Sequence, residues 1–478
     1  MAFIENENAW AESVFGECEL GDRLRTARLV QLAAAQAASP EATVGAICGG
    51  DTAFREGSYR LLNNDAVEPD DIAEGVFLRT VDDCAERELI LSIQDTTSAS
   101  FTHGPKDELG ELTTKESTNR GLLVHSTLAV DAENGDVIGL LDQARWVRPK
   151  KRPGRNKRSS IPYEKKESYK WELATRRVMG RVGDPSRFVV VADREADVYE
   201  YLRYLDSIGH GAVIRACYDR CVATKEGHLW KHLESQPILG TYDLYIEQRG
   251  AMYGSKNHGT RPARQGRWAT LSVQTAEVTL VPSRSPKSRS DMHLRVSAVY
   301  VRECKQTVPK KGKPIDWMLL TFEQINTFED ALRLIGYYEK RWLIEEFHKC
   351  WKTGCRQEER SHQSRAALER GMVILAAIGV RLLQLKTMAE RDPEAPAEIV
   401  FTQDQVACLK DLTRQRQNVV PRRPTVEWVY YEIGKLAGWT DTKRTGRVGW
   451  STLWRGLEKF SAIYTGWALA HGSAGAKM

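Results

Sequence analysis

Three acidic residues stand where a chain can bring carboxylates together around a metal ion. Asp95 ends the apolar stretch ELILSIQD and Asp193 ends RFVVVAD, so we expect each at the carboxyl end of a buried strand, where a sheet opens to ligands. Alone, an Asp in such a place is more often a turn or N-cap residue. With Glu345 on a later helix, the three supply the hard oxygen ligands that Mg²⁺ prefers, and two such ions can promote in-line phosphoryl displacement.

A second polar feature surrounds Glu345 in the stretch YEKRWLIEEFHKCWK, from 338 to 352. On one continuous helix, Tyr338, Arg341, Glu345 and Lys352 fall within roughly 60° of one another. The other side of that helix carries an apolar stripe typical of a core-facing surface, made of Leu343, Ile344, Phe347, Cys350 and Trp351. The sequence therefore predicts a row of a phenol, two cations and a carboxylate opposite a buried face.

Composition indicates a soluble globular protein of several domains or subdomains. The chain has 478 residues, of which 41% are hydrophobic and 28% charged. We find no apolar run of about 18 residues and no signal-peptide pattern at the start, so the expected location is the cytoplasm. Nine scattered cysteines favour reduced thiols. A zinc site at His348, Cys350 and Cys355 stays open as a minor alternative, because their spacing matches no standard ligand pattern.

Basic clusters recur along the chain although its net charge is only +5. They occupy residues 23–28, 148–158, 261–267, 414–424 and 442–447. Any one of them is more often a solvated face than a binding site. Five such clusters, interleaved with acidic segments, indicate that a polyanion binds along an extended surface of the protein.

The order of predicted elements points to an α/β fold. Residues 9–70 have helical character, with a second helical stretch around Phe54 to Leu62. Strands are expected over 88–97, 121–130, 136–146, 187–197 and 211–216, with an Asn-Gly hairpin turn between the second and third and a helix from about Tyr163 to Met179. Apolar and polar residues alternate from about 217 to 325, which indicates a β-rich insertion. Helices are expected from Phe328 onward.

Several motifs give the chain a resemblance to a known family. They are GDRLRTARLV (21–30), EGSYRLL (56–62), QDTTS (94–98), VADREADVYEYL (191–202), RPAR (261–264), RWLIEEFHKCWKTG (341–354), RLLQLK (381–386) and TKRTG (442–446). On these motifs the chain resembles the DDE transposases of the bacterial insertion-sequence group that is named for a Tyr, Arg, Glu, Lys signature. In that signature 2, 3 and 6 residues separate the four positions, and Tyr338, Arg341, Glu345 and Lys352 match this spacing.

The resemblance implies a fold and a domain plan. The fold is α/β, a ribonuclease-H-like mixed sheet core with a β-rich insertion, flanked by helical N- and C-terminal domains. Residues 1–70 would bind transposon-end DNA, 71–390 would form the catalytic domain with the insertion at about 217–325, and 391–478 would form a helical dimerisation domain.

The resemblance also implies roles for single residues. Asp95, Asp193 and Glu345 would be the catalytic, metal-binding carboxylates, with two Mg²⁺ ions per active site and Mn²⁺ as a substitute. Trp317 takes the place of a tryptophan on which a flipped base stacks, while Tyr338, Arg341 and Lys352 would hold the neighbouring phosphate. In the N-terminal region, Arg25, Arg28 and Arg60 would contact transposon-end DNA.

The activity implied by the resemblance is cut-and-paste DNA transposition. The enzyme would bind the inverted ends of its element, excise it by nicking, hairpin formation and hairpin opening, and join the 3′-hydroxyl ends to target DNA. Its partners would be double-stranded transposon-end DNA, target DNA and a second copy in a homodimer, with no membrane and a place on the bacterial nucleoid. Two alternatives stay open: a structure-selective metal nuclease on the same core, and a catalytically silent end-binding repressor.

Overall fold

The computed structural model describes residues 7–101, 104–112, 120–149, 160–246, 264–281, 293–310, 312–416, 419–442 and 446–472. These residues form two compact units. Unit 1 comprises residues 1–161, 176–183 and 342–478, and unit 2 comprises 162–175 and 184–341. The basic stretch 150–158, together with 261–263, 417–418 and 443–445 of the other clusters, lies outside the described residues.

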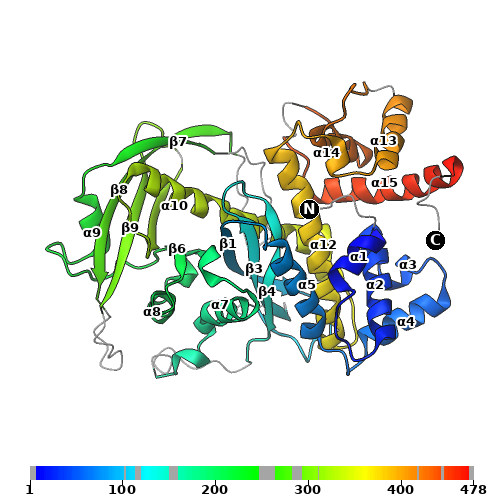
Figure 1. Cartoon of the computed structure of the whole chain (residues 1–478), viewed down its shortest axis with the longest axis horizontal. Coiled ribbons are helices and arrows are strands. Elements are labelled where there is room, and N and C mark those ends of the chain that lie inside the picture. Colours follow the sequence, from blue (N-terminus) through cyan, green and yellow to red (C-terminus); the bar gives the residue numbers. More distant parts are fainter. Residues whose placement is uncertain are drawn as a thin grey trace. The chain divides into compact units, whose positions relative to one another are not determined.

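Unit 1 begins with five helices (Figure 1). They are α1 (Glu7–Phe15), α2 (Arg23–Ala38), α3 (Val44–Ile47), α4 (Thr52–Leu62) and α5 (Pro69–Asp83). Asp22 and Asp51 start two of them by accepting hydrogen bonds from the main-chain N–H groups of Leu24 and Phe54, both at 2.9 Å. The helical N-terminal region predicted from sequence is thus present.

The sheet of unit 1 is antiparallel. Its strands are β1 (Ile90–Ser100), β2 (Gly110–Glu111), β3 (Arg120–Asp131) and β4 (Val137–Trp146), and β3 pairs with the other three. The predicted hairpin between β3 and β4 is confirmed, because Gly135 of the Asn-Gly pair takes φ +77°. Every residue of β3 after Arg120 is buried, so this strand lies in the interior of unit 1.

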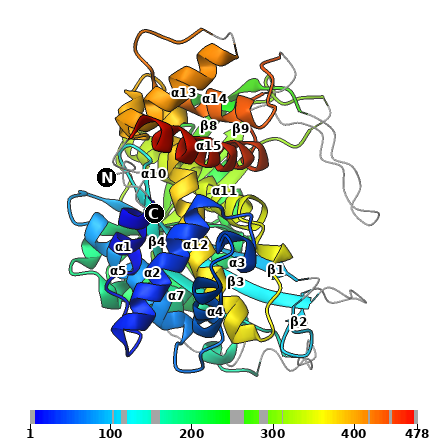
Figure 2. The same cartoon turned by 90° about the vertical axis from the view of Figure 1, so that its right-hand side faces the viewer.

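The long helix α12 (Arg365–Arg391) forms the centre of unit 1, where it contacts α2, α4, α5, β4 and α14 (Figure 2). By length and composition it could cross a membrane. However, 72% of its most apolar window is buried inside the protein, as in the core helix of a soluble protein.

The remaining helices of unit 1 surround α12. They are α11 (Trp342–Lys349), α13 (Gln403–Gln415), α14 (Val426–Leu436) and α15 (Trp450–His471). The last three share an apolar core that includes Val429, Tyr430, Leu453 and Phe460. The aromatic residues at the C-terminal end therefore contribute in part to folding.

Unit 2 contains a six-stranded mixed sheet. Its order is β5 (Phe188–Ala192), β6 (Gly211–Arg215), β10 (Asp316–Thr321), β9 (Leu294–Glu303), β8 (Arg267–Leu280) and β7 (Gly240–Ile246). β5 and β6 are parallel and the other pairs are antiparallel. The helices α8 (Tyr199–Ser207), α9 (Leu229–Glu234) and α10 (Phe328–Lys340) belong to the same unit. The strands β7 to β10 all lie within the β-rich insertion expected at about 217–325.

One predicted helix is shorter than expected. Residues 163–169 form two 3₁₀ turns separated by the extended residue Lys166, and α7 (Lys170–Arg181) begins only afterwards. The reason is the distribution of apolar residues. Only from Trp171 do they recur at helical spacing, with Ala174 and Val178 buried beside it.

Candidate active site

Asp95 lies in the middle of β1 and not at the end of a strand as predicted. It pairs with Ser126 of β3, and β1 continues to Ser100 because β3 supplies partners along its whole length. The β-branched residues Thr96 and Thr97 favour this extension. One carboxylate oxygen of Asp95 accepts a hydrogen bond of 2.7 Å from the N–H of Thr96.

Glu345 lies on α11, the helix whose residue His348 lies beside Asp95. This helix packs on β1 and β3, and His348 lies one turn after Glu345 on it. His348 Nδ1 is 3.9 Å from the Oδ2 atom of Asp95, and its Nε2 is 3.2 Å from the Oγ atom of Ser126. His348 thus connects α11, the helix that carries Glu345, to the strand that carries Asp95.

His348 is neutral in this site. Burial lowers its pKa to about 3, and the positive charge of Lys352 acts in the same direction. A neutral imidazole beside Asp95 adds no positive charge that would compete with a cation. Sequence reasoning assigned His348 only to the zinc alternative, although its position one helical turn from Glu345 was a signal for this role.

The zinc alternative is wrong. Cys350 and Cys355 are fully buried, and their thiols donate to the carbonyl oxygens of Gly379 and Leu375. Burial raises the pKa of both thiols, so they stay protonated. Within the described residues, no group of three or more His, Cys, Asp or Glu side chains is gathered as a metal site.

Lys352 reaches β1 from a π-helical turn. Its Nζ donates to the carbonyl oxygen of Ser98 at 2.8 Å and lies 3.7 Å from the Oε1 atom of Glu358. The same Oε1 accepts the N–H of Ser100 at 2.7 Å. Glu358, which the sequence did not single out, thus joins Lys352 to the strand that carries Asp95.

The polar row does not lie on one continuous helix, and this expectation is wrong. α10 ends at Lys340, Arg341 follows it, α11 covers Trp342–Lys349, and residues Cys350–Gly354 form the π turn. The wider turn accompanies close packing of Trp351 on α12. Trp351 is fully buried, and a Cβ added to Gly379 of α12 would lie 3.3 Å from the Cβ of Trp351. The predicted buried positions Ile344 and Phe347 are confirmed.

Asp193 follows β5 directly, as predicted. In unit 2 its carboxylate caps a short turn by accepting the N–H of Glu195 at 2.8 Å. Because β5 and β6 are parallel, Asp193 lies at the same edge of the sheet as the residues that follow β6. A capping contact of this kind leaves the second carboxylate oxygen able to bind another group.

The aromatic and cationic candidates of unit 2 lie close together. Trp317 is the second residue of β10. The next residue, Met318, accepts the N–H of Ala216 just after β6, so Trp317 lies near the edge that carries Asp193. Its ring centroid is 5.4 Å from that of Tyr338, and Arg341 lies 5.8 Å from the same tyrosine ring. Tyr338 is only 5% exposed, so its ring supports Trp317 from inside.

The N-terminal arginines differ in their surroundings. Arg25 donates to the carbonyl oxygen of Leu20 at 2.9 Å, and Arg28 lies 5.4 Å from the ring of Phe54. Arg60 is exposed in the last turn of α4. Arg28 therefore contributes to the packing of α2 against α4, in addition to any contact that it makes with DNA.

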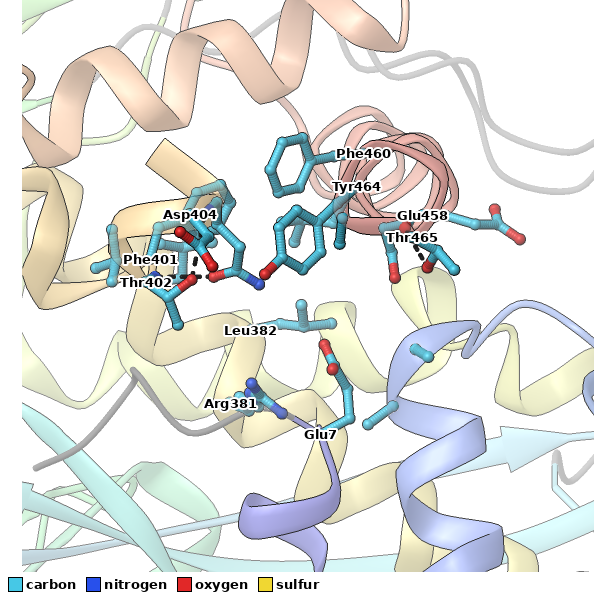
Figure 3. Close-up of a pocket in the computed structure, with 18 of the residues that line it drawn as sticks. Glu7, Arg381, Leu382, Phe401, Thr402, Asp404, Glu458, Phe460, Tyr464 and Thr465 are labelled. Carbon is cyan, nitrogen blue, oxygen red and sulfur yellow. Dashed lines mark hydrogen bonds between the residues drawn. The ribbon is translucent and has the colours of Figure 1, made fainter. Parts of the chain in front are cut away.

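A cavity of about 470 Å³ lies elsewhere in unit 1 (Figure 3). Its walls come from α1, α2, α12, α13 and α15, and its lining includes Glu7, Arg381, Asp404 and Tyr464. None of the ten predicted site residues lines it. The cavity is therefore separate from the candidate active site.

The acids of unit 1 fit a divalent cation. Carboxylate oxygens are the ligands that Mg²⁺ takes from proteins, and it commonly uses one or two of them together with waters and substrate phosphates. Asp95 and Glu345 offer two, beside a neutral imidazole. Asp193 of unit 2 is the third candidate ligand.

Comparison with protein families gives two matches. Residues 7–67 match a family described as transposase DNA-binding, and residues 174–379 match one described as transposase DDE domain. The first match includes all three N-terminal arginines, and the second begins after Asp95 and includes the other candidates. The matches confirm the mixed α/β fold with a ribonuclease-H-like core, and DDE domains generally act with divalent metal ions.

Proposed function

We propose a cut-and-paste mechanism for this chain, which its DNA-binding and DDE domains identify as a DNA transposase. The observation that supports the proposal is that His348, one helical turn after Glu345 on α11, lies 3.9 Å from Asp95. Within the transposases, we assign the chain to the group with the Tyr-Arg-Glu-Lys signature, near the transposase of transposon Tn-five. This assignment rests on the spacing of Tyr338, Arg341, Glu345 and Lys352.

In this proposal Asp95, Asp193 and Glu345 hold two Mg²⁺ ions, for which Mn²⁺ can substitute. When bound, the ions lower the barrier by activating the attacking oxygen and stabilising the leaving one. The carboxylates orient the ions and balance their charge. Neutral His348 lies beside Asp95 without adding a charge at the site.

The other candidates bind DNA. Trp317 offers a stacking surface for a base that leaves the duplex, and Tyr338, Arg341 and Lys352 bind the adjacent phosphate through charge-assisted hydrogen bonds. Arg25, Arg28 and Arg60 bind the transposon end from the N-terminal helices. Phosphate contacts are the commoner kind for such arginines.

The proposed reaction has four steps. Water attacks one strand at the element end and breaks the bond to the 3′-oxygen, which leaves as a hydroxyl group. That 3′-hydroxyl attacks the opposite strand to form a hairpin, a second water opens the hairpin, and the 3′-hydroxyl ends attack target DNA. Two chains act as a homodimer on paired ends, on the nucleoid of the bacterial cell.

The test uses purified protein with DNA that carries the inverted repeats flanking its gene. We expect nicks, hairpins and joined products with Mg²⁺, and binding without cleavage with Ca²⁺. Glu345→Gln removes one charge at nearly constant shape, so cleavage falls by roughly three orders of magnitude while end binding in Ca²⁺ persists.

Two other outcomes would favour the alternatives. Cleavage without joined products would favour the structure-selective nuclease. Sequence-specific binding without cleavage in Mg²⁺ or Mn²⁺ would favour the silent repressor. A Glu345→Gln variant that cleaves as fast as the unaltered protein would remove Glu345 from the active site.

A further inference from the structure

A buried carboxylate beside Glu345 connects α11 to the C-terminal helices. Glu346 is 5% exposed and accepts three hydrogen bonds. Its Oε1 accepts from Lys349 Nζ at 2.7 Å, within α11. Its Oε2 accepts from Lys386 Nζ of α12 at 2.8 Å and from Trp450 Nε1, at the start of α15, at 2.7 Å. The ammonium of Lys386 also lies 4.7 Å from the centre of the Trp450 ring.

These contacts fix the rotation of α11 about its axis. A charged carboxylate is costly to bury unless its oxygens are fully paired, so Glu346 is stable here only in the orientation that meets donors from two other helices. Neighbouring residues on a helix are separated by 100°, so fixing Glu346 also fixes the direction of Glu345. On another side of α11, His348 contacts Ser126.

We propose that Glu346 is a positioning residue for Glu345, and that the indole N–H of Trp450 is the contribution of α15 to this arrangement. The inference rests on the proposed function, because it takes Glu345 to be a metal-binding acid. Residues that orient metal ligands typically change metal affinity or activity by about 10- to 100-fold when they are altered. Glu346 acts on the ligand only through the helix, so we expect the low end of that range.

The test replaces Trp450 by Phe, which keeps a ring beside Lys386 and removes the N–H donor. Trp428→Phe is the matched control, since it lies in α14 and its indole N–H has no hydrogen-bond partner among the described residues. Affinity for Mn²⁺ is measured by electron paramagnetic resonance on the complex with end DNA. We expect about tenfold weaker Mn²⁺ binding for Trp450→Phe and an unchanged affinity for the control.

A purely structural role predicts a different result. It would lower the melting temperature of Trp450→Phe but leave its Mn²⁺ affinity and the Mg²⁺ concentration for half-maximal cleavage unchanged, and this would overturn the inference. Glu346→Gln provides a second measurement, with weaker Mn²⁺ binding expected and end binding in Ca²⁺ retained.

Failure of the inference is distinguishable from failure of the proposed function. If the unaltered protein cleaves end DNA, Glu345→Gln does not, and both Trp450→Phe and Glu346→Gln bind Mn²⁺ normally, only the positioning role is wrong. If the unaltered protein shows neither metal binding nor cleavage, the proposed function is wrong and the positioning role is rejected with it.

Discussion

At the scale of the residue, two tryptophans of unit 2 offer a direct comparison. Trp317 and Trp268 both lie on strands, and each ring is close to a tyrosine, Tyr338 at 5.4 Å and Tyr245 at 5.2 Å. Trp317 has Arg341 beside its tyrosine, whereas Trp268 is 65% exposed on β8. Among the described residues, the surroundings of Trp317 thus combine an aromatic surface with a cation that could bind the neighbouring phosphate.

Replacing Trp317 by Ala should therefore slow hairpin formation by roughly one to two orders of magnitude and spare the first nick. The lost stacking is worth about 1–3 kcal/mol, and only the hairpin requires a base outside the duplex. Denaturing gels that separate nicked, hairpin and linear products give the measurement. Trp268→Ala is the control and should change neither step.

A substrate that lacks the extruded base should partly rescue Trp317→Ala, because the base no longer has to leave the stack. Equal loss of nicked, hairpin and linear products would instead identify Trp317 as a residue needed for folding.

A second prediction concerns Arg28. Its guanidinium packs on Phe54 and against Gly57, where a Cβ would lie 2.8 Å from the arginine Nε. Arg28→Ala should weaken end binding. If the contact is to phosphate, the slope of the logarithm of the binding constant against the logarithm of the salt concentration should become shallower by about one. If the contact is to a base, the salt slope stays and sequence preference relaxes. Titrations at several salt concentrations test this, with exposed Arg79→Ala as control, and unaltered end binding would remove Arg28 from the interface.

The candidate site residues show how far sequence reasoning extends. Asp193 follows its strand as predicted, because a short apolar run before an acid is a local pattern. Asp95 could not be placed in the same way, since its strand is extended by pairing with β3. The contact between His348 and Ser126 joins residues 222 positions apart, and no local pattern contains it.

At the scale of the element, the N-terminal helices are tied to α12 and to the segment before it. Buried Arg370 donates to the carbonyl oxygens of Leu62 and Val67 at 2.6 and 2.5 Å. Arg360 donates to those of Pro40 and Ala42. His362 lies in the same region, where its Nε2 would be 3.3 Å from a Cβ on Gly371.

His362 makes this region sensitive to acid. Burial lowers its pKa to about 4, with Arg360 acting in the same direction, whereas an unfolded histidine titrates near about 6.5. The unfolded chain therefore binds the proton first, and stability present above about pH 6.5 is lost as the pH falls toward 4. The loss is at most about 1.4 kcal/mol per pH unit for one proton.

His362→Gln should make the free energy of unfolding less dependent on pH across that window. Urea unfolding at pH 5, 6 and 7 measures the slope, and His228→Gln, at an exposed position, should keep the original slope. An unchanged slope in His362→Gln would show that His362 is not buried as a neutral ring.

Elements with strong local patterns were predicted well and those set by packing were not. The Asn134–Gly135 turn specifies its hairpin because glycine accepts the positive φ. The end of α10 after Lys340 is not marked by a proline or glycine at that point, so the local sequence does not predict it. The π turn at Cys350–Gly354 accompanies the close approach of Trp351 to α12, which depends on residues far away in the sequence.

At the scale of the whole molecule, the proposed homodimer needs a surface that folding leaves exposed. In α15, Leu453 and Phe460 belong to the apolar core, whereas Ile463 and Leu469 are exposed, Leu469 by 57%. A charge at these two positions should prevent paired-end complexes and leave single-end complexes intact, since both side chains are exposed.

The double variant Ile463→Glu, Leu469→Glu tests this by gel mobility with two end fragments of different length. Leu78→Glu, at an exposed apolar position of α5, is the control. Paired complexes that persist in the double variant would place the dimer contact on another surface. The domain limits at 70 and 390 stay predictions, and limited proteolysis of the free protein would test them.

The boundary between the two compact units falls between Arg341 and Trp342, inside the four-residue signature. Tyr338 and Arg341 belong to one unit and Glu345 and Lys352 to the other, joined without any intervening linker. Chimaeras built from two related enzymes usually exchange compact units at their borders. Here such an exchange would divide the signature between parents, so a functional hybrid should inherit residues 338–352 as one block. Homologous recombination is thus expected to tolerate crossover points near 161 and 183 better than one at 341.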